Sequence, residues 1–137
     1  MSRYISSSLA DQVTERAQGR CEYCRISIAD TYFGSEIDHI QSLKHGGETN
    51  LDNLAIACQI CNRRKGTDLG SVLPGSTQIV RFFNPRIDIW SEHFSASSNG
   101  EIEPLTDIGR VTSLIFGFND QERIDERIGL IEIEALD

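Results

Sequence analysis

Four cysteines are the residues whose type and spacing indicate chemistry most directly in this chain. They form two C-x-x-C pairs, Cys21 with Cys24 and Cys58 with Cys61, and the sequence contains no other cysteine. Two thiolates separated by two residues can bind one tetrahedral ion from a tight turn, and a second pair completes the four-sulfur shell of structural zinc. The spacing therefore predicts a closed zinc site.

Two disulfides, or two redox-active motifs, are the alternatives for the same thiols. Residues 1–10 contain no apolar signal segment, which favours a reducing compartment, the cytoplasm, where disulfides rarely persist. A thioredoxin-like motif is expected once, near a βαβ pattern, whereas the C-x-x-C motif occurs twice here. We therefore expect zinc, because metal binding to a site absent from the unfolded chain adds folding free energy to a small domain.

A second set of polar residues lies between and directly after the cysteine pairs. Residues 36–40 and 53–58 are predicted strands of a hairpin, joined by a polar loop. The basic run that begins at Asn62 predicts a short helix. Since a hairpin followed by a helix can bring Asp38, His39 and Asn62 within reach of one point, these side chains are candidates for a common site.

The position of Asp38 next to His39 raises a geometric difficulty. Neighbouring side chains of a regular strand point to opposite faces of the sheet. If both residues serve one site, the strand must bend or end there, so we expect irregular backbone at residues 38–39. The alternative for His39 is a loop histidine that bonds a carbonyl group.

Three basic residues, Arg63, Arg64 and Lys65, directly follow Asn62. Arginine and lysine supply most of the contacts that proteins make with nucleic-acid phosphates. The run therefore predicts contact with a phosphate backbone. The alternative is a solvated helix face without a binding role.

Residues 8–66 resemble the HNH endonucleases of the ββα-metal (His-Me finger) type, in their zinc-bearing form with four cysteine ligands. The resemblance implies that His39 is the general base and that Asn53 braces the loop through backbone hydrogen bonds. It also implies that Asp38 holds the catalytic metal together with Asn62, the last position of the motif. Many members have histidine at that position, so this chain resembles an H-N-N variant.

The resemblance implies a metal-dependent endonuclease that hydrolyses DNA phosphodiester bonds. Asp38 and Asn62 would offer two oxygen ligands and no nitrogen, which favours Mg²⁺ or Mn²⁺ as the catalytic ion. Zinc and the catalytic ion would then occupy different sites. The alternative is a catalytically silent, zinc-stabilised module that binds nucleic acid or protein.

Charge is distributed unevenly along the chain, whose formal net charge is −8. Residues up to Gly66 include 8 basic and 8 acidic side chains, and the remainder includes 5 basic and 13 acidic ones. Affinity for a polyanion that is independent of sequence comes from basic charge. We therefore expect weak or steeply salt-dependent binding to double-stranded DNA, or a basic protein partner.

The sequence predicts an α+β protein with two parts. Residues 1–70 are expected to form the ββα-metal nuclease core with its four-cysteine zinc knuckle, preceded by a helix that begins near Ser8. Residues 71–137 are expected to form a small α/β extension packed on the core. No segment has the length and hydrophobicity of a membrane span.

The predicted extension contains a strand over residues 78–83, an aromatic turn region and two helices. Trp90 and Phe94 are the expected buried aromatics, and the helices are expected over residues 107–116 and after Asn119. The pattern of this region resembles a C-terminal extension of bacterial, especially cyanobacterial, HNH proteins.

Overall fold

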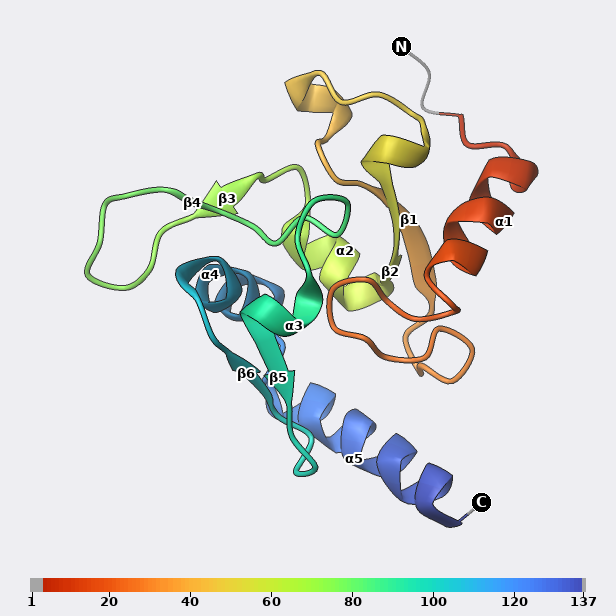
Figure 1. Cartoon of the computed structure of the whole chain (residues 1–137), viewed down its shortest axis with the longest axis vertical. Coiled ribbons are helices and arrows are strands. Elements are labelled where there is room, and N and C mark those ends of the chain that lie inside the picture. Colours follow the sequence, from red (N-terminus) through yellow and green to blue (C-terminus); the bar gives the residue numbers. More distant parts are fainter. Residues whose placement is uncertain (1–3, 137) are drawn as a thin grey trace. The chain divides into compact units, whose positions relative to one another are not determined.

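The computed structural model describes residues 4–136, and their contacts divide the chain into two compact units (Figure 1). Unit 1 comprises the residues up to Leu69 together with Asn84–Ile87, and unit 2 comprises Gly70–Phe83 and the residues from Asp88 onward. Helices and small antiparallel sheets occur in the same chain, which confirms the predicted α+β class. The division into a core of residues 1–70 and an extension of residues 71–137 packed on it stays a prediction.

Unit 1 is built on an antiparallel hairpin of β1 (Ser35–His39) and β2 (Leu54–Cys58), which lie side by side in Figure 1. Every residue of β2 is buried. The expectation that this strand bends or ends at residues 38–39 is confirmed in part, because β1 ends at His39 and a bend follows at the next residue. The irregular backbone expected within residues 38–39 is absent, because the ladder pairs Asp38 with Ala55 and His39 with Leu54.

Helix α1 (Ser7–Arg16) covers β2 and supplies the apolar core of unit 1. Val13 packs with Leu54 and Ile56, and all three side chains are buried. Ser6 caps the helix, because its hydroxyl accepts a hydrogen bond from the backbone N–H of Leu9 in the first turn. The helix thus begins at Ser7, one residue before the predicted start near Ser8, because several consecutive serines can each supply the cap.

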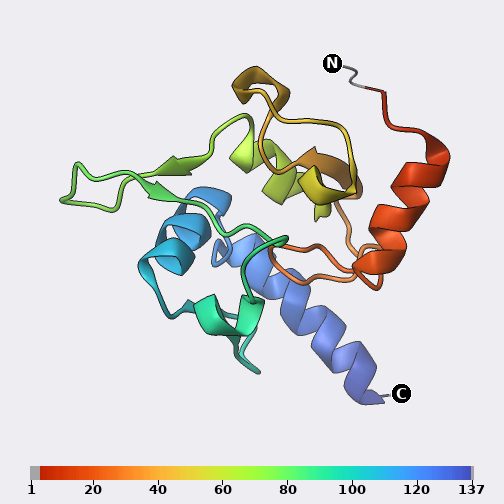
Figure 2. The same cartoon turned by 45° about the horizontal axis from the view of Figure 1, so that its top comes forward.

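The chain between the strands is organised by two 3-10 turns, Leu43–His45 and Leu51–Asn53, and α2 (Gln59–Lys65) follows β2 directly (Figure 2). The Sγ atom of Cys58 caps α2 by accepting a hydrogen bond from the Cys61 N–H at 3.5 Å. The hairpin-then-helix order and the cysteine cluster confirm the predicted core. The helix begins three residues before Asn62 and therefore carries Cys61 as well as the basic run.

Unit 2 consists of two short hairpins and three helices within the described residues. These elements are β3 (Gly70–Ser71), β4 (Val80–Arg81), α3 (Trp90–His93), β5 (Phe94–Ala96), β6 (Ile102–Pro104), α4 (Asp107–Phe116) and α5 (Gln121–Leu136). The two predicted helices are confirmed, whereas the strand predicted over 78–83 is only two residues long. None of the described helices is both long enough and apolar enough to cross a bilayer.

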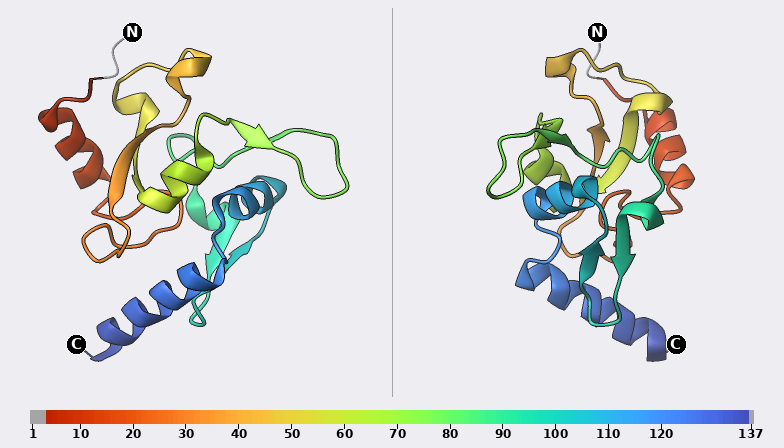
Figure 3. Two further views of the ribbon diagram at one scale, coloured as in Figure 1. Left: turned by 180° about the vertical axis from the view of Figure 1, so that it is seen from behind. Right: turned by 60° about the vertical axis from the view of Figure 1, so that its left-hand side comes forward.

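Phenylalanine rings form the interior of unit 2. The ring centroid of Phe94 lies 5.5 Å from that of Phe83 and 5.4 Å from that of Phe118, and all three rings are buried. Trp90, predicted to be buried, is half-buried with its ring 5.1 Å from that of Phe94. The turn between β5 and β6 lies against α5 (Figure 3), where a Cβ atom on Gly100 would come within 2.8 Å of α5 backbone.

Candidate active site and metal centre

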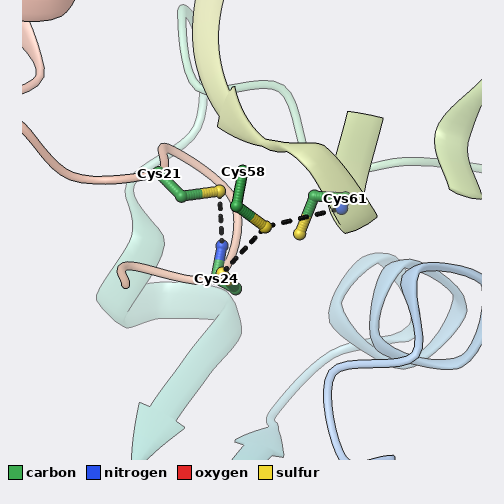
Figure 4. A group of neighbouring side chains, drawn as sticks. All are labelled: Cys21, Cys24, Cys58 and Cys61. Atoms are coloured by element: carbon green, nitrogen blue, oxygen red, sulfur yellow. Dashed lines mark hydrogen bonds between the residues drawn. The ribbon is translucent and has the colours of Figure 1, made fainter. Parts of the chain in front are cut away.

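The four cysteines lie at one point of unit 1 (Figure 4), with their Sγ atoms all within 4.8 Å of one another. Both pairs have the same local geometry, because the N–H of Cys24 points to Sγ of Cys21 at 3.4 Å as that of Cys61 does to Sγ of Cys58. Such N–H groups stabilise thiolates. All four residues belong to the described part of the chain, and none is in a disulfide.

The sulfur spacing fits a tetrahedral zinc ion. Zn–S bonds of about 2.3 Å place the sulfurs of a tetrahedron about 3.8 Å apart, and Sγ of Cys24 lies 3.7 Å from Sγ of Cys58. A disulfide would need about 2.05 Å. Burial raises the pKa values of Cys21 and Cys61 well above the ordinary value, because desolvation disfavours thiolates. A cation that neutralises them is therefore what this cluster can bind most favourably.

Asp38 is a buried carboxylate held by two partners. The Tyr23 hydroxyl donates to its Oδ2 atom at 2.6 Å, and the Lys65 ammonium lies 3.3 Å from both carboxylate oxygens. Burial raises the pKa of Asp38, while the charge of Lys65 and the hydrogen bonds from both partners oppose that rise. Tyr23 was not among the predicted site residues, because a contact across fifteen residues leaves no local signal.

Lys65 does not belong to the surface that could contact nucleic acid, and this prediction is corrected. Its side chain is 2 % exposed, and its ammonium donates to the carbonyl of His39 at 3.0 Å as well as to Asp38. Helical spacing explains the burial, since Lys65 lies one turn after the buried Cys61. Arg63 and Arg64, on the other side of α2, are exposed.

His39 is half-buried at the end of β1, and its Nε2 atom lies 2.9 Å from the Thr49 hydroxyl. Desolvation and the positive charge of Lys65 both lower the pKa of His39. The imidazole is therefore neutral near pH 7. If Nε2–H donates to Thr49, the lone pair lies on Nδ1, so Thr49 can set the tautomer. Thr49 is a second residue that the sequence patterns did not identify.

Asn53 ties the two ends of the loop after β1 together. Its Oδ1 atom accepts from the Gln41 N–H at 2.8 Å, and its Nδ2 donates to the carbonyls of Gln41 at 2.9 Å and Glu48 at 2.8 Å. Gly47 permits this close approach, because a Cβ atom there would lie 1.7 Å from the Gln41 oxygen. The loop that carries Thr49 is thereby fixed relative to β1.

Asn62 faces the strand from α2. Its Nδ2 atom donates to a carboxylate oxygen of Glu36, which lies two residues before Asp38 on the same face of β1. This hydrogen bond fixes the orientation of the Asn62 amide group. The Oδ1 atom of Asn62 can then accept from, or coordinate, another group. Glu36 is a third residue absent from the prediction, although the two-residue spacing to Asp38 could have indicated it.

One open pocket of about 510 Å³ brings three of the predicted residues together. Its lining includes Asp38, His39, Asn62 and Lys44. The donor set suits a hard cation. Tyr23 and Lys65 each donate one hydrogen bond to Asp38, one to each oxygen, and a carboxylate has about four lone-pair positions, so Asp38 retains acceptor positions for a ligand.

A salt bridge anchors residues 84–87 within unit 1. The guanidinium of Arg86 pairs with Glu22, which lies between the first two cysteines, and the other carboxylate oxygen of Glu22 accepts from the Ile56 N–H at 3.2 Å. This segment lies beyond the predicted core boundary. Arg86 therefore contacts the turn that carries Cys21 and Cys24, and its guanidinium already has a carboxylate partner within unit 1.

A hairpin and a following helix with a thiolate cluster at their junction define a zinc-type ββα domain. Residues 21–68 match the family model described as HNH endonuclease, so this segment is an HNH endonuclease domain. The four clustered cysteines are consistent with the zinc-binding HNH type. HNH domains commonly bind nucleic acid, which suggests a nuclease-type or nucleic-acid-binding function. A comparison with curated proteins finds no match.

Proposed function

We propose that this protein is a metal-dependent endonuclease that hydrolyses phosphodiester bonds of DNA, with His39 as the general base. The observation that supports this proposal best is the shared pocket of Asp38, His39 and Asn62 in a segment that matches the HNH model. A neutral imidazole, a buried carboxylate and an amide oxygen, from three residues that line one pocket, are suited to activating water beside a bound phosphate.

The imidazole of His39 takes a proton from the attacking water. Its lowered pKa keeps the accepting nitrogen unprotonated at neutral pH, and Thr49 holds the ring through Nε2. The water oxygen then forms a bond to phosphorus as the bond to the 3′ oxygen breaks, and the leaving oxygen takes a proton from solvent, which gives a 5′ phosphate and a 3′ hydroxyl. Asn53 keeps the loop in place while the proton is transferred.

Asp38 and Asn62 would hold Mg²⁺ or Mn²⁺, which supplies Lewis-acid stabilisation of the negative charge that develops on the phosphate and the leaving oxygen. Both residues provide oxygen donors, the type these ions prefer. Glu36 orients Asn62, and Tyr23 with Lys65 fixes Asp38. The roles of these side chains are thus to place oxygen atoms at the pocket wall.

Exposed arginines on α2 are the proposed contacts to the DNA backbone. Arg63 and Arg64 lie one and two residues after Asn62 and are exposed. In unit 2, the guanidinium groups of Arg81 and Arg110 pair with Asp88 and Asp107, and those of Arg123 and Arg127 donate to the carbonyls of Phe116 and Gly100. We infer from the position of Arg63 and Arg64 beside Asn62 that phosphate binding depends on unit 1.

The proposal is tested by nicking of supercoiled plasmid DNA by the zinc-loaded chain with Mg²⁺. His39→Ala is expected to lower the rate about 10²- to 10⁴-fold, the usual contribution of a general base. His45→Ala is the matched control, because His45 is an exposed histidine of the adjoining loop. Equal nicking by the parent and His39→Ala would contradict the proposal.

A second candidate function is a zinc-stabilised binding module with a silent site. The ion pair between Asp38 and Lys65 favours it, because a resident ammonium already neutralises the carboxylate. This candidate predicts DNA binding that depends on Arg63 and Arg64 but no Mg²⁺-dependent nicking. The plasmid assay, combined with a binding measurement, separates the two functions.

A further inference from the structure

Tyr23 joins the cysteine cluster to the pocket. It lies inside the first C-x-x-C turn, between Glu22 and Cys24, and its side chain is 0 % exposed. Its hydroxyl donates to Oδ2 of Asp38 at 2.6 Å. One side chain therefore spans from a turn that holds two cysteines to the carboxylate on the pocket wall.

We propose that Tyr23 is a positioning residue that couples zinc binding to the Asp38 carboxylate. The turn that carries Tyr23 has its geometry set by Cys21 and Cys24, whose sulfurs converge with those of the second pair. A tyrosine side chain has only two torsions, so its hydroxyl follows the backbone of that turn. A bound ion that fixes the turn also fixes the hydrogen bond to Asp38.

The hydroxyl has a role that ring packing does not explain. A phenylalanine would fill the same buried volume, whereas the O–H group makes a short bond to an ionised acceptor, and bonds of that kind are about twice as strong as neutral ones. Without the hydroxyl, a lone pair of the buried Asp38 would lose its partner. Lys65 would then be the side chain that still holds the carboxylate.

Coupling of this kind is reciprocal. If zinc strengthens the bond between Tyr23 and Asp38, that bond must strengthen zinc binding by the same factor. Zinc then acts on the pocket as well as on folding. The catalytic importance of Asp38 rests on the proposed function, but the coupling between the ion and the carboxylate can be measured without DNA.

The test compares zinc affinity of the full chain and of Tyr23→Phe by competition with a chromophoric chelator. Tyr32→Phe is the matched control, because Tyr32 is 88 % exposed. We expect Tyr23→Phe to retain one zinc per chain and to bind it about 5- to 10-fold more weakly, the range of ordinary coupling energies. Equal zinc affinity in the two variants would overturn the proposal.

A spectroscopic measurement on the unmodified chain gives a second test, which does not depend on how well the variant folds. A buried hydroxyl bonded to a carboxylate should give a slowly exchanging, downfield proton signal. We expect that signal with zinc bound and a change in its chemical shift when the larger ion Cd²⁺ replaces zinc, an exchange that leaves unit 1 loaded with metal and folded. An identical signal with both ions would contradict the coupling.

Nicking activity, recorded on the same samples, separates this proposal from the proposed function. A parent chain that does not cut DNA but shows the metal-dependent signal and the weakened affinity of Tyr23→Phe leaves the coupling intact and rejects the nuclease. A parent that cuts DNA, with zinc affinity unchanged in Tyr23→Phe, rejects the coupling alone.

Discussion

The interiors of the two units differ in chemistry. Unit 1 buries four thiols, an ion pair between Asp38 and Lys65, and the hydroxyl of Tyr23, with a small aliphatic cluster beside them. Unit 2 buries phenylalanine rings in mutual contact, together with the side chains of Thr112 and Arg123, which are hydrogen-bonded within the unit. Buried polar groups stabilise a fold only when they are partnered, and four clustered thiols need a cation as the partner of their charged form. We therefore expect unit 1 to depend on a bound ion and unit 2 to be stable without one.

Removal of zinc should have the largest effect on the folding of unit 1 and should distinguish it most clearly from unit 2. Apparent zinc binding energies in small metal-dependent domains are about 10–16 kcal/mol, which exceeds the stability of most domains of this size. We expect a strong chelator, or Cys58→Ser, to unfold unit 1 and leave unit 2 folded. Trp90, the single tryptophan of the chain, reports on unit 2 by its fluorescence.

The control for zinc removal is the same emission after Zn²⁺ is restored. Far-ultraviolet circular dichroism should lose the signal of α1 and α2 on chelation while Trp90 emission stays constant. Simultaneous loss of both signals would show that the two units unfold together and would remove the contrast between their interiors.

Removal of one buried charge should have the next largest effect. Lys65→Met leaves the Asp38 carboxylate buried without its counter-ion, and such losses cost about 3–5 kcal/mol. We expect a lower urea midpoint for zinc-loaded unit 1. Arg110→Met in unit 2 is the matched control, because its exposed pair with Asp107 should contribute only about 0–1 kcal/mol.

The buried pair permits a further control. Lys65→Met combined with Asp38→Leu replaces both charges by apolar groups and should recover much of the lost stability, while nicking activity stays low because Asp38 is absent. A Lys65→Met variant as stable as the Arg110→Met variant would contradict the inferred role of the buried pair.

The pH dependence of nicking should show a smaller effect that is specific to the pocket. The pKa of His39 lies below its ordinary value of 6.5, so the neutral imidazole, which is the base, persists as the pH falls through that value. We expect the rate to be maintained at pH 6.5 and to decline only below it. The measurement is the initial nicking rate from pH 5 to 8. A decline centred above pH 6.5 would indicate a raised pKa of His39 and would contradict this prediction.

Much of the fold could be predicted because its signals are local. The cysteine spacing predicted the cysteine cluster, and two short strand-like segments joined by a polar loop predicted the hairpin. The helix Asp107–Phe116 was predicted at both ends because Thr106 caps its first turn and Gly117 ends it in a left-handed conformation. The irregular backbone expected at Asp38 is absent, since pairing with β2 keeps the strand regular until it ends at His39.

The remaining site residues depend on contacts that the sequence does not encode locally. The basic run predicts Lys65 as a surface cation because it follows two arginines. Its helical spacing from the buried Cys61, however, indicates a buried position. Tyr23 and Thr49 meet Asp38 and His39 only after the chain folds. The roles assigned from the family pattern to Asp38, His39, Asn53 and Asn62 stay predictions that need kinetic tests.

Chemical rescue tests the central claim most directly. Zinc-loaded His39→Ala is assayed for plasmid nicking with Mg²⁺, with and without added imidazole, beside His45→Ala under the same conditions. If His39 is the base, imidazole should restore part of the lost rate in His39→Ala and leave His45→Ala unchanged. A His39→Ala rate equal to that of the parent chain, or a parent chain without Mg²⁺-dependent nicking, would contradict the account.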